Sequence, residues 1–220
     1  MNRFAGLQVD LEILQRNRDS FLETHSNEDI YIAYCEYLIQ KYHMNISKEE
    51  LINERWSSVD DILKNELTYK DGVPELLLWF KDNGFTVVLA TATTQRQLDI
   101  YAKGNPHMAN AFSFYDTFDL IIRKEDVQHK KPHPEVYLKV LEYYHANPEE
   151  CLVFEDSLHG VMASKSAGID TINVYDKYSD KDRLKIDSLV DYKIDSYLEF
   201  MNILRGGKNY EYTKRNNEGL

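Results

Sequence analysis

The feature that most constrains the fold is an alternation of short apolar runs with helical segments, which begins near residue 71. The run at 85–90, Phe-Thr-Val-Val-Leu-Ala, is typical of a strand that is buried on both faces. Strands that alternate with helices form βαβ units, so the sequence predicts an α/β fold with a doubly wound, Rossmann-like parallel sheet. We expect strands at 85–90, 120–122, 152–154 and 171–174, and helices at 75–83, 94–102, 134–144 and 160–167.

The chain before residue 70 has a different pattern. Apolar residues recur at spacings of three and four between Ile30 and Lys41, which predicts an amphipathic helix. Ser-x-x-Asp or Ser-x-x-Glu sequences beginning at Ser26, Ser47 and Ser58 predict three helix starts. We therefore expect a small helical bundle over residues 12–68. The polar, aperiodic stretch 206–220 is expected to be a C-terminal extension.

Charge and composition exclude several classes of protein. The chain has 26 Lys and Arg against 37 Asp and Glu, a formal net charge of −11, which argues against nucleic-acid binding by phosphate neutralisation and against a polybasic membrane surface. No apolar run approaches the ~18 residues of a membrane span. The two cysteines, Cys35 and Cys151, are too few for a disulfide framework. We expect a cytoplasmic protein that is a monomer or a weak dimer.

Polar residues stand at the ends of two predicted strands, where parallel sheets bind their ligands. Thr91 follows the strand at 85–90, and it could cradle a phosphate with the N–H groups after it or simply cap the next helix. Glu155 and Asp156 follow the strand at 152–154. Adjacent carboxylates suit Mg²⁺, although Asp156 or Ser157 could instead cap the following helix.

A third polar segment, Lys-Lys-Pro-His-Pro at 130–134, precedes a predicted helix. Its prolines hold the backbone extended, so Lys131 could be fixed as a counter-charge for phosphate or belong to a solvated loop. His129 and His133 are four residues apart, but Pro132 disfavours a shared helix face. We therefore do not expect a metal-binding pair there.

The combination of these segments resembles the haloacid dehalogenase superfamily, in particular its β-phosphoglucomutase-like phosphatases and phosphomutases. Val153–Ile169 is similar to the fourth motif of the family, Lys131 to the third and Thr91 to the second. The resemblance covers residues 4–203. It implies an α/β core formed by residues 1–11 and 69–205, with an α-helical cap inserted at 12–68.

The resemblance also implies an activity, namely Mg²⁺-dependent phosphoryl transfer from a small phosphorylated metabolite such as a sugar phosphate. Thr91, Ala92 and Lys131 would hold the phosphate. The metal would be held by Asp156, by Glu155 and by the backbone carbonyl of Ala5. The cap would supply specificity and exclude water when it closes.

The first motif departs from the family pattern, which has an apolar strand ending in Asp-x-Asp-Gly. When Ala5–Glu12 is aligned with the second half of that motif, Arg3 takes the place of the nucleophilic aspartate and Ala5 that of the acid/base aspartate. Arginine offers no lone pair for attack on phosphorus, and alanine cannot transfer a proton. We therefore expect the chain as given to be inactive or strongly impaired.

Two explanations of this departure stay open. The sequence derives from an active enzyme whose start is truncated or altered, or it is a pseudoenzyme that keeps the fold and a phosphate pocket. A non-catalytic phosphate-binding or interaction module is the alternative function.

Overall fold

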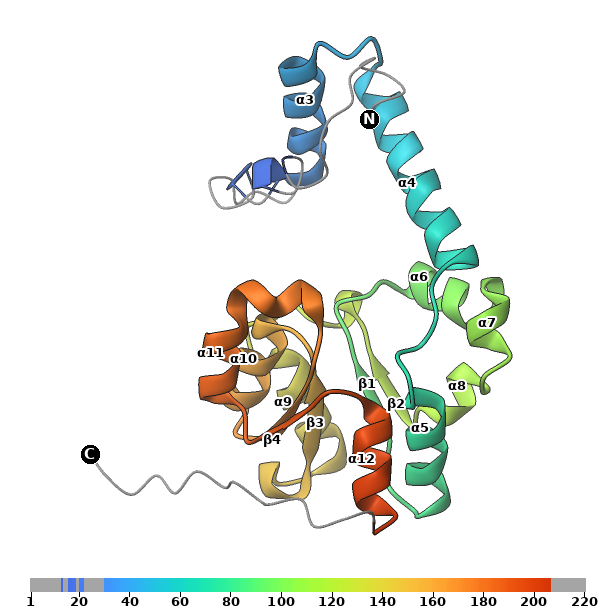
Figure 1. Cartoon of the computed structure of the whole chain (residues 1–220), viewed down its shortest axis with the longest axis vertical. Coiled ribbons are helices and arrows are strands. Elements are labelled where there is room, and N and C mark those ends of the chain that lie inside the picture. The colour runs from blue at the N-terminus through green and yellow to red at the C-terminus, as the bar shows by residue number, and fades with distance from the viewer. Residues whose placement is uncertain (1–12, 14–15, 19, 22–29, 207–220) are drawn as a thin grey trace, which may run out of the picture. The chain divides into compact units, whose positions relative to one another are not determined.

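The structure, a computed structural model, describes residues 13, 16–18, 20–21 and 30–206 of the chain (Figure 1). The chain divides into two compact units, with the boundary between Ile62 and Leu63. None of the helices in these ranges is long and apolar enough to cross a membrane. The assignment of residues 12–68 to a cap and of 1–11 and 69–205 to a core stays a prediction, and the predicted extension lies, from residue 207 on, outside the described residues.

In the first unit, the helix α3 (Ile30–Tyr42) is followed by the start of α4 (Lys48–Asn65). The buried apolar cluster of this unit lies on α3, on the turn after it and on α4. Its members are Tyr34, Cys35, Leu38, Met44 and Leu51. Tyr34 and Leu38 lie one helical turn apart, so the predicted apolar face of this helix is present.

One predicted helix start is confirmed and one is wrong. The N–H of Glu50 donates to Ser47 Oγ at 3.2 Å, and the N–H of Ser47 donates to Glu50 Oε2 at 3.0 Å, which is a capping box. Ser58 lies inside α4, where its hydroxyl donates to the carbonyl of Glu54 at 2.8 Å. No helix starts there, because a serine can bond to the preceding turn of the same helix. The predicted start at Ser26 lies outside the described residues.

The second unit contains five short strands and the helices that connect them, within the ranges given above. The strands are β1 (Val88–Ala90), β2 (Leu120–Ile122), β3 (Leu152–Glu155), β4 (Asp170–Val174) and β5 (Tyr192–Ile194). The α-helices are α5 (Val73–Asp82), α6 (Gln95–Asp99), α7 (Pro106–Ala109), α8 (Phe114–Thr117), α9 (Glu135–Tyr144), α10 (Leu158–Ser166), α11 (Arg183–Leu189) and α12 (Tyr197–Leu204). A π-helical turn, η1 (Ile100–Gly104), follows α6, and short 3₁₀ turns are η2 (Lys124–Asp126), η3 (Pro148–Glu150) and η4 (Lys177–Asp182).

The strands pair in parallel, as predicted, but in two sheets. The first sheet pairs β1 with β2, with Val88 opposite Leu120. The second has the order β3-β4-β5, with Leu152 opposite Asp170 and Ile172 opposite Tyr192. No strand in the described ranges joins β1 to β3 by main-chain hydrogen bonds.

Side chains connect the two sheets where the main chain does not. The helix α9 packs against β1 and β2, and α10 packs against β3 and β4. One buried cluster contains Ile122 from β2, Val153 from β3, Tyr137 from α9 and Ala163 from α10. The alternate residues Leu89 and Ile121 belong to another cluster, so successive side chains of each strand serve opposite faces of the sheet.

Helices therefore cover both faces of the parallel strands, and the predicted doubly wound α/β class is confirmed. On the face opposite α9 and α10, α5 and α12 lie side by side (Figure 1). Gly72 precedes α5 at φ +86°, and a Cβ on it would approach the backbone nitrogen of Leu198 to 2.5 Å. This glycine is required both by the left-handed backbone conformation and by the contact with α12.

The first predicted strand is shorter than expected. Phe85 is exposed, and its N–H donates to the carbonyl of Phe80 at 2.9 Å, so it takes part in the capping turn that follows α5. The N–H of Val87 donates at 2.8 Å to a side-chain oxygen, Oδ2 of Asp119, and the ladder begins only at Val88. Phe85 and Val87, which the apolar pattern assigns to the strand, therefore form other hydrogen bonds instead of the strand pairing.

Candidate active site

Thr91 directly follows β1, and its side chain is held within the chain's own turn. Its N–H donates to the carbonyl of Ile122 at 2.9 Å, which extends the β1–β2 pairing. Its Oγ1 accepts from the N–H of Thr93 at 3.0 Å and donates to Thr93 Oγ1 at 2.9 Å, with Ala92 between them. The N-cap of α6 is Thr94, so Thr91 is not the helix cap. Thr91 and Ala92 therefore occupy the turn at the carboxyl end of β1.

Lys131 reaches across to this turn from the loop before α9. Its Nζ donates to the carbonyl of Ala90 at 3.2 Å and to Tyr137 Oη at 3.0 Å, and it lies 4.8 Å from the centroid of the Tyr137 ring. It also forms a short ion pair with Glu155 Oε1, and the Lys131 side chain is only 14% exposed. Lys131 is thus a fixed cation between the ends of β1 and β3, not part of a solvated loop.

Glu155 is the anionic partner, and its side chain is 11% exposed. Its Oε1 also accepts from Tyr137 Oη at 2.8 Å, while Oε2 accepts from the N–H of Asp156 at 3.3 Å. A Cβ on Gly160 would overlap this carboxylate, so the glycine makes the room that Glu155 occupies. Burial, and then the charge of Glu155, raise the pKa of Tyr137, which keeps its hydroxyl protonated as a donor.

The helix that follows β3 is capped by neither carboxylate. Ser157 is the N-cap of α10, and its Oγ accepts from the N–H of Gly160 at 3.1 Å. The cap that the sequence left open is therefore Ser157, and Asp156 is available for another role.

Asp156 shares a cation with a second carboxylate. Lys70 Nζ lies 2.7 Å from Asp156 Oδ2 and 2.7 Å from Asp176 Oδ2. Asp176 follows β4, and Lys70 lies in the connection between α4 and α5. The Lys70 and Asp156 side chains are 39% and 44% exposed. Burial alone would lower the pKa of Lys70, but the hydrogen bonds to Asp156 and Asp176 raise it.

The structure thus brings together most of the residues that the sequence singled out. Contacts of Lys131 join the end of β1, next to Thr91, to Glu155 at the end of β3, and Asp156 follows directly. Arg3 and Ala5 lie outside the described residues.

Three participants were not found from the sequence. Asp176 lies two residues after a strand, which is the signal that could have identified it. Tyr137 lies in α9, six residues after Lys131, and no spacing in the sequence marks it. Lys70, which lies 86 residues before Asp156, carries no local signal.

Carboxylate oxygens such as those of Asp156 and Asp176 are of the type that Mg²⁺ binds. Here their shared cation is the Lys70 ammonium group, and the Glu155 carboxylate faces Lys131. Asp156 and its ammonium partner are both partly exposed, so rotation of the lysine would open this carboxylate to an ion from solvent. Glu155 is less suited, because its oxygens are already engaged in a buried set of hydrogen bonds.

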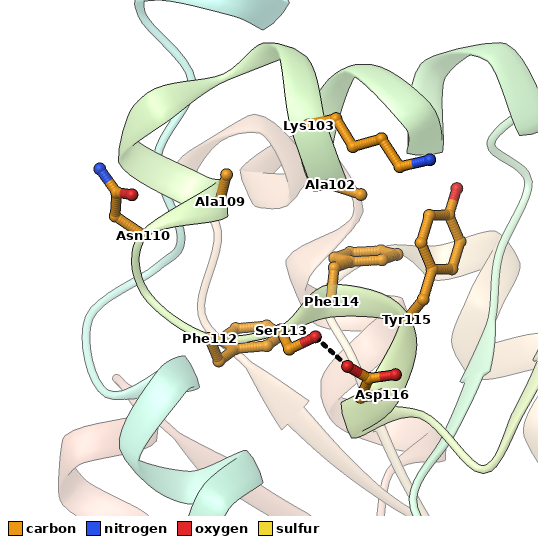
Figure 2. A pocket seen from close by; sticks show the side chains of 9 residues that line it. All are labelled: Ala102, Lys103, Ala109, Asn110, Phe112, Ser113, Phe114, Tyr115 and Asp116. Carbon is orange, nitrogen blue, oxygen red and sulfur yellow. Dashed lines mark hydrogen bonds between the residues drawn. The ribbon is translucent and has the colours of Figure 1, made fainter.

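A separate pocket of about 600 Å³ lies among η1, α7 and α8 (Figure 2). Lys103, Phe112, Phe114 and Tyr115 line it, and Ser113 hydrogen-bonds Asp116 at its edge. The residues that line it include none of the strand-end side chains described above. The pocket is therefore distinct from the strand-end site.

Comparison with known proteins decides the family. The profile of the haloacid dehalogenase-like hydrolases matches residues 20–174. The chain belongs to this family. The matched range contains Thr91, Lys131, Glu155 and Asp156.

Individual relatives agree with this assignment. The phosphorylated carbohydrates phosphatase of Thermotoga maritima is 34% identical over 125 residues, which cover 57% of this chain and 53% of that protein. Hexitol phosphatase B of Escherichia coli K12 is 28% identical over 128 residues, which cover 58% of this chain and 54% of that protein. The matches thus span about half the length of these two relatives.

A solved structure from Thermotoga maritima, described as a "putative beta-phosphoglucomutase", is 25% identical to this chain with a TM-score of 0.66. The match covers 92% of this chain and 86% of that one. The resemblance to the superfamily and to its β-phosphoglucomutase-like group is confirmed.

Proposed function

We propose that the strand-end site is a phosphoryl-transfer site of the phosphatase or phosphomutase type, which binds a small phosphorylated metabolite such as a sugar phosphate. We further propose that the chain as given turns substrate over very slowly or not at all, and that residues 12–68 form a helical cap domain. The observation that carries the proposal is the fixed position of Lys131 between the ends of β1 and β3. The names of the two phosphatases similar to this chain support the substrate class.

The phosphate group would be held by Thr91, Ala92 and Lys131. The turn after β1 offers the Thr91 hydroxyl and the N–H of Ala92, and Lys131 offers the positive charge. Because the Lys131 ammonium donates to Ala90, Tyr137 and Glu155 at once, it is oriented before a ligand arrives. A group that is already oriented binds with a smaller entropic loss.

The metal ion would be Mg²⁺, held by Asp156 and the backbone carbonyl of Ala5 and assisted by Glu155, which would first have to give up one of its hydrogen bonds. When bound, it would neutralise the charge of the transferring phosphoryl group. Asp156 would have to exchange its Lys70 partner for the ion. Lys70 and Mg²⁺ therefore compete for the same carboxylate.

The impaired turnover follows from the first motif. A family member uses one aspartate as a nucleophile on phosphorus and another as acid and base, and Arg3 and Ala5 take their places here. Without a nucleophile the covalent step has no starting group, and such losses reduce rates by several orders of magnitude.

The test of turnover is hydrolysis of para-nitrophenyl phosphate and of a panel of sugar phosphates with Mg²⁺, for the given chain and for Asp156→Ala. We expect both proteins to give the same rate as buffer alone. Robust Mg²⁺-dependent turnover that Asp156→Ala abolishes would refute the proposed impairment while supporting the site.

A non-catalytic phosphate-binding module is the second candidate, and the Lys70 bridge favours it. An ammonium group between Asp156 and Asp176 balances their charge without a metal ion. Calorimetric titration with the same sugar phosphates distinguishes the candidates, because a module binds without turnover. Thr91→Val should weaken such binding by about tenfold to a hundredfold, the equivalent of one hydrogen bond to a charged group. Absence of both binding and turnover would refute the site itself.

The competition for Asp156 has its own test. Lys70→Met should bind Mg²⁺ more tightly than the unchanged chain, because the carboxylate loses its internal cation. Lys81→Met, which removes an ion pair with Asp119, is the matched control and should leave Mg²⁺ affinity unchanged. Equal affinity in all three proteins would show that Lys70 does not compete with the ion.

A further inference from the structure

The loop before α9 places two imidazole rings and a carboxylate together at the surface. The ring centroids of His129 and His133 are 4.6 Å apart. His129 Nδ1 lies 3.0 Å from Glu135 Oε2. One ligand atom from each of the three residues lies within 4.8 Å of the other two. The sequence argued against a pair of histidines here because Pro132 disfavours a shared helix face, but a turn brings them together instead.

Main-chain hydrogen bonds hold this arrangement. The N–H of His133 donates to the carbonyl of Lys130 at 3.0 Å, which closes the turn. The N–H groups of Gln128 and His129 donate to the two oxygens of Glu135 at 2.9 and 2.8 Å. The N–H of Glu135 donates in turn to His133 Nδ1 at 3.2 Å. Main-chain N–H groups therefore orient the Glu135 carboxylate and the His133 ring, and the His129 ring is held against Glu135 Oε2.

Main-chain donors hold the Glu135 carboxylate in place. The N–H groups of Gln128 and His129 each donate to a different oxygen of it. Lys139 Nζ is 3.6 Å from Glu135 Oε1, on the oxygen that does not face His129. Both oxygens of Glu135 therefore already have partners, and an ion at Oε2 would replace the contact with His129 Nδ1.

The donor set selects the class of ion. Imidazole nitrogens suit borderline transition-metal ions such as Zn²⁺, whereas Mg²⁺ prefers oxygen ligands and keeps its water. In a tetrahedral zinc site with bonds of about 2.0–2.1 Å, neighbouring ligand atoms lie about 3.3 Å apart. The three groups must therefore close by about 1.5 Å at most, which side-chain rotation allows because the His129 side chain is 63% exposed.

We propose that His129, His133 and Glu135 form a binding site for one Zn²⁺-like transition-metal ion, with its remaining position open to water. The site is separate from the proposed Mg²⁺ ligands and belongs to the loop that carries Lys131. Bound metal would cross-link this loop to the start of α9 and so stabilise the folded protein at the place where Lys131 is positioned.

The test is calorimetric titration of chelator-stripped protein with Zn²⁺ alone, at neutral pH and without substrate. The unchanged chain should bind with micromolar or tighter affinity, and His129→Gln or His133→Gln should weaken this binding by about tenfold or more, as loss of a metal-site group does. His107→Gln, which removes an exposed imidazole on α7, is the matched control and should bind like the unchanged chain. Circular dichroism of each variant verifies that it is folded.

Co²⁺ gives a second measurement. It should produce the visible absorption of a four- or five-coordinate ion with the unchanged chain and with His107→Gln, but not with His133→Gln. Binding that is equally strong in His129→Gln, His133→Gln and the unchanged chain would overturn the proposal, as would no binding at all. Neither result bears on phosphoryl transfer, because both experiments omit substrate and Mg²⁺.

Discussion

The ion pair between Lys131 and Glu155 allows a stability prediction that depends directly on the structure. Both side chains are largely buried, with exposed fractions of 14% and 11%. In Lys131→Met, the carboxylate would keep Tyr137 Oη at 2.8 Å and the N–H of Asp156 at 3.3 Å but lose its counter-charge. An uncompensated buried charge is among the largest single-site effects on stability.

The magnitude can be estimated from these contacts. Breaking one partner of a buried pair costs about 3–5 kcal/mol. The remaining donors and the small residual exposure place Lys131→Met at the lower end, about 3 kcal/mol. The double variant Lys131→Met/Glu155→Gln removes both charges, so we expect it to be about 2 kcal/mol more stable than the single variant.

The assay is urea unfolding followed by the fluorescence of Trp79, which lies in α5 of the second unit. The protein has two tryptophans, so all variants are made in a Trp56→Phe background. Lys193→Met is the control, because it breaks a more exposed pair with Asp187 and should cost at most about 1 kcal/mol.

Two outcomes would refute this reasoning. One is a double variant no more stable than Lys131→Met, which would assign the loss to packing of the lysine stem and not to the charge of Glu155. The other is a Lys131→Met variant as stable as the Lys193→Met control.

Three further predictions concern single side chains. Gly160→Ala should displace the Glu155 carboxylate and destabilise the protein by about 1–3 kcal/mol, as overpacking does, whereas Gly160→Ala combined with Glu155→Ala should recover most of that loss in the same urea assay. Asn105→Ala should destabilise the protein by about 2–4 kcal/mol in thermal unfolding, because the buried amide donates at 2.7 Å to two main-chain carbonyls near the end of α4. The exposed Asn110→Ala is the control, and a loss of stability in Asn105→Ala smaller than in this control would contradict the prediction. Hydrogen bonds from Lys81 and the N–H of Val87 lower the pKa of Asp119 in the folded protein. The contribution of ionised Asp119 to the free energy of unfolding is therefore complete above its ordinary pKa of 3.8, and it is lost as the pH falls through the lower pKa of the folded state. The stability difference between the unchanged chain and Asp119→Asn should therefore shrink in acid titrations below that pH, and a difference that grows would be inconsistent with the shift.

Much of the fold could be predicted because its signals are local. The run ending at Ala90 and the segment around Val153 are continuous apolar stretches, and both form parallel strands. The capping box at Ser47 is equally local, and it is present. The strand β5 was not predicted, because Tyr192-Lys193-Ile194 is short and has a lysine at its centre.

The candidate site was predictable in part, for a related reason. Thr91, Lys131, Glu155 and Asp156 each follow a recognisable segment and together match a family pattern. Their partners are set by tertiary structure: the place of Lys70 beside Asp156 and Asp176 depends on how three distant segments pack. The histidine cluster could not be predicted from the four-residue spacing, because Pro132 disfavours a helix there, whereas a hydrogen-bonded turn provides the same proximity.

The Lys70 bridge has a mechanical consequence. Lys70, in the connection between α4 and α5, forms ion pairs with Asp156 and Asp176, which follow β3 and β4. These side chains are in contact with water. Such an attraction weakens as salt screens it, over a Debye length of about 8 Å at physiological ionic strength. Salt, or any solute that binds Asp156, therefore weakens the ion pairs that attach this connection to the ends of β3 and β4.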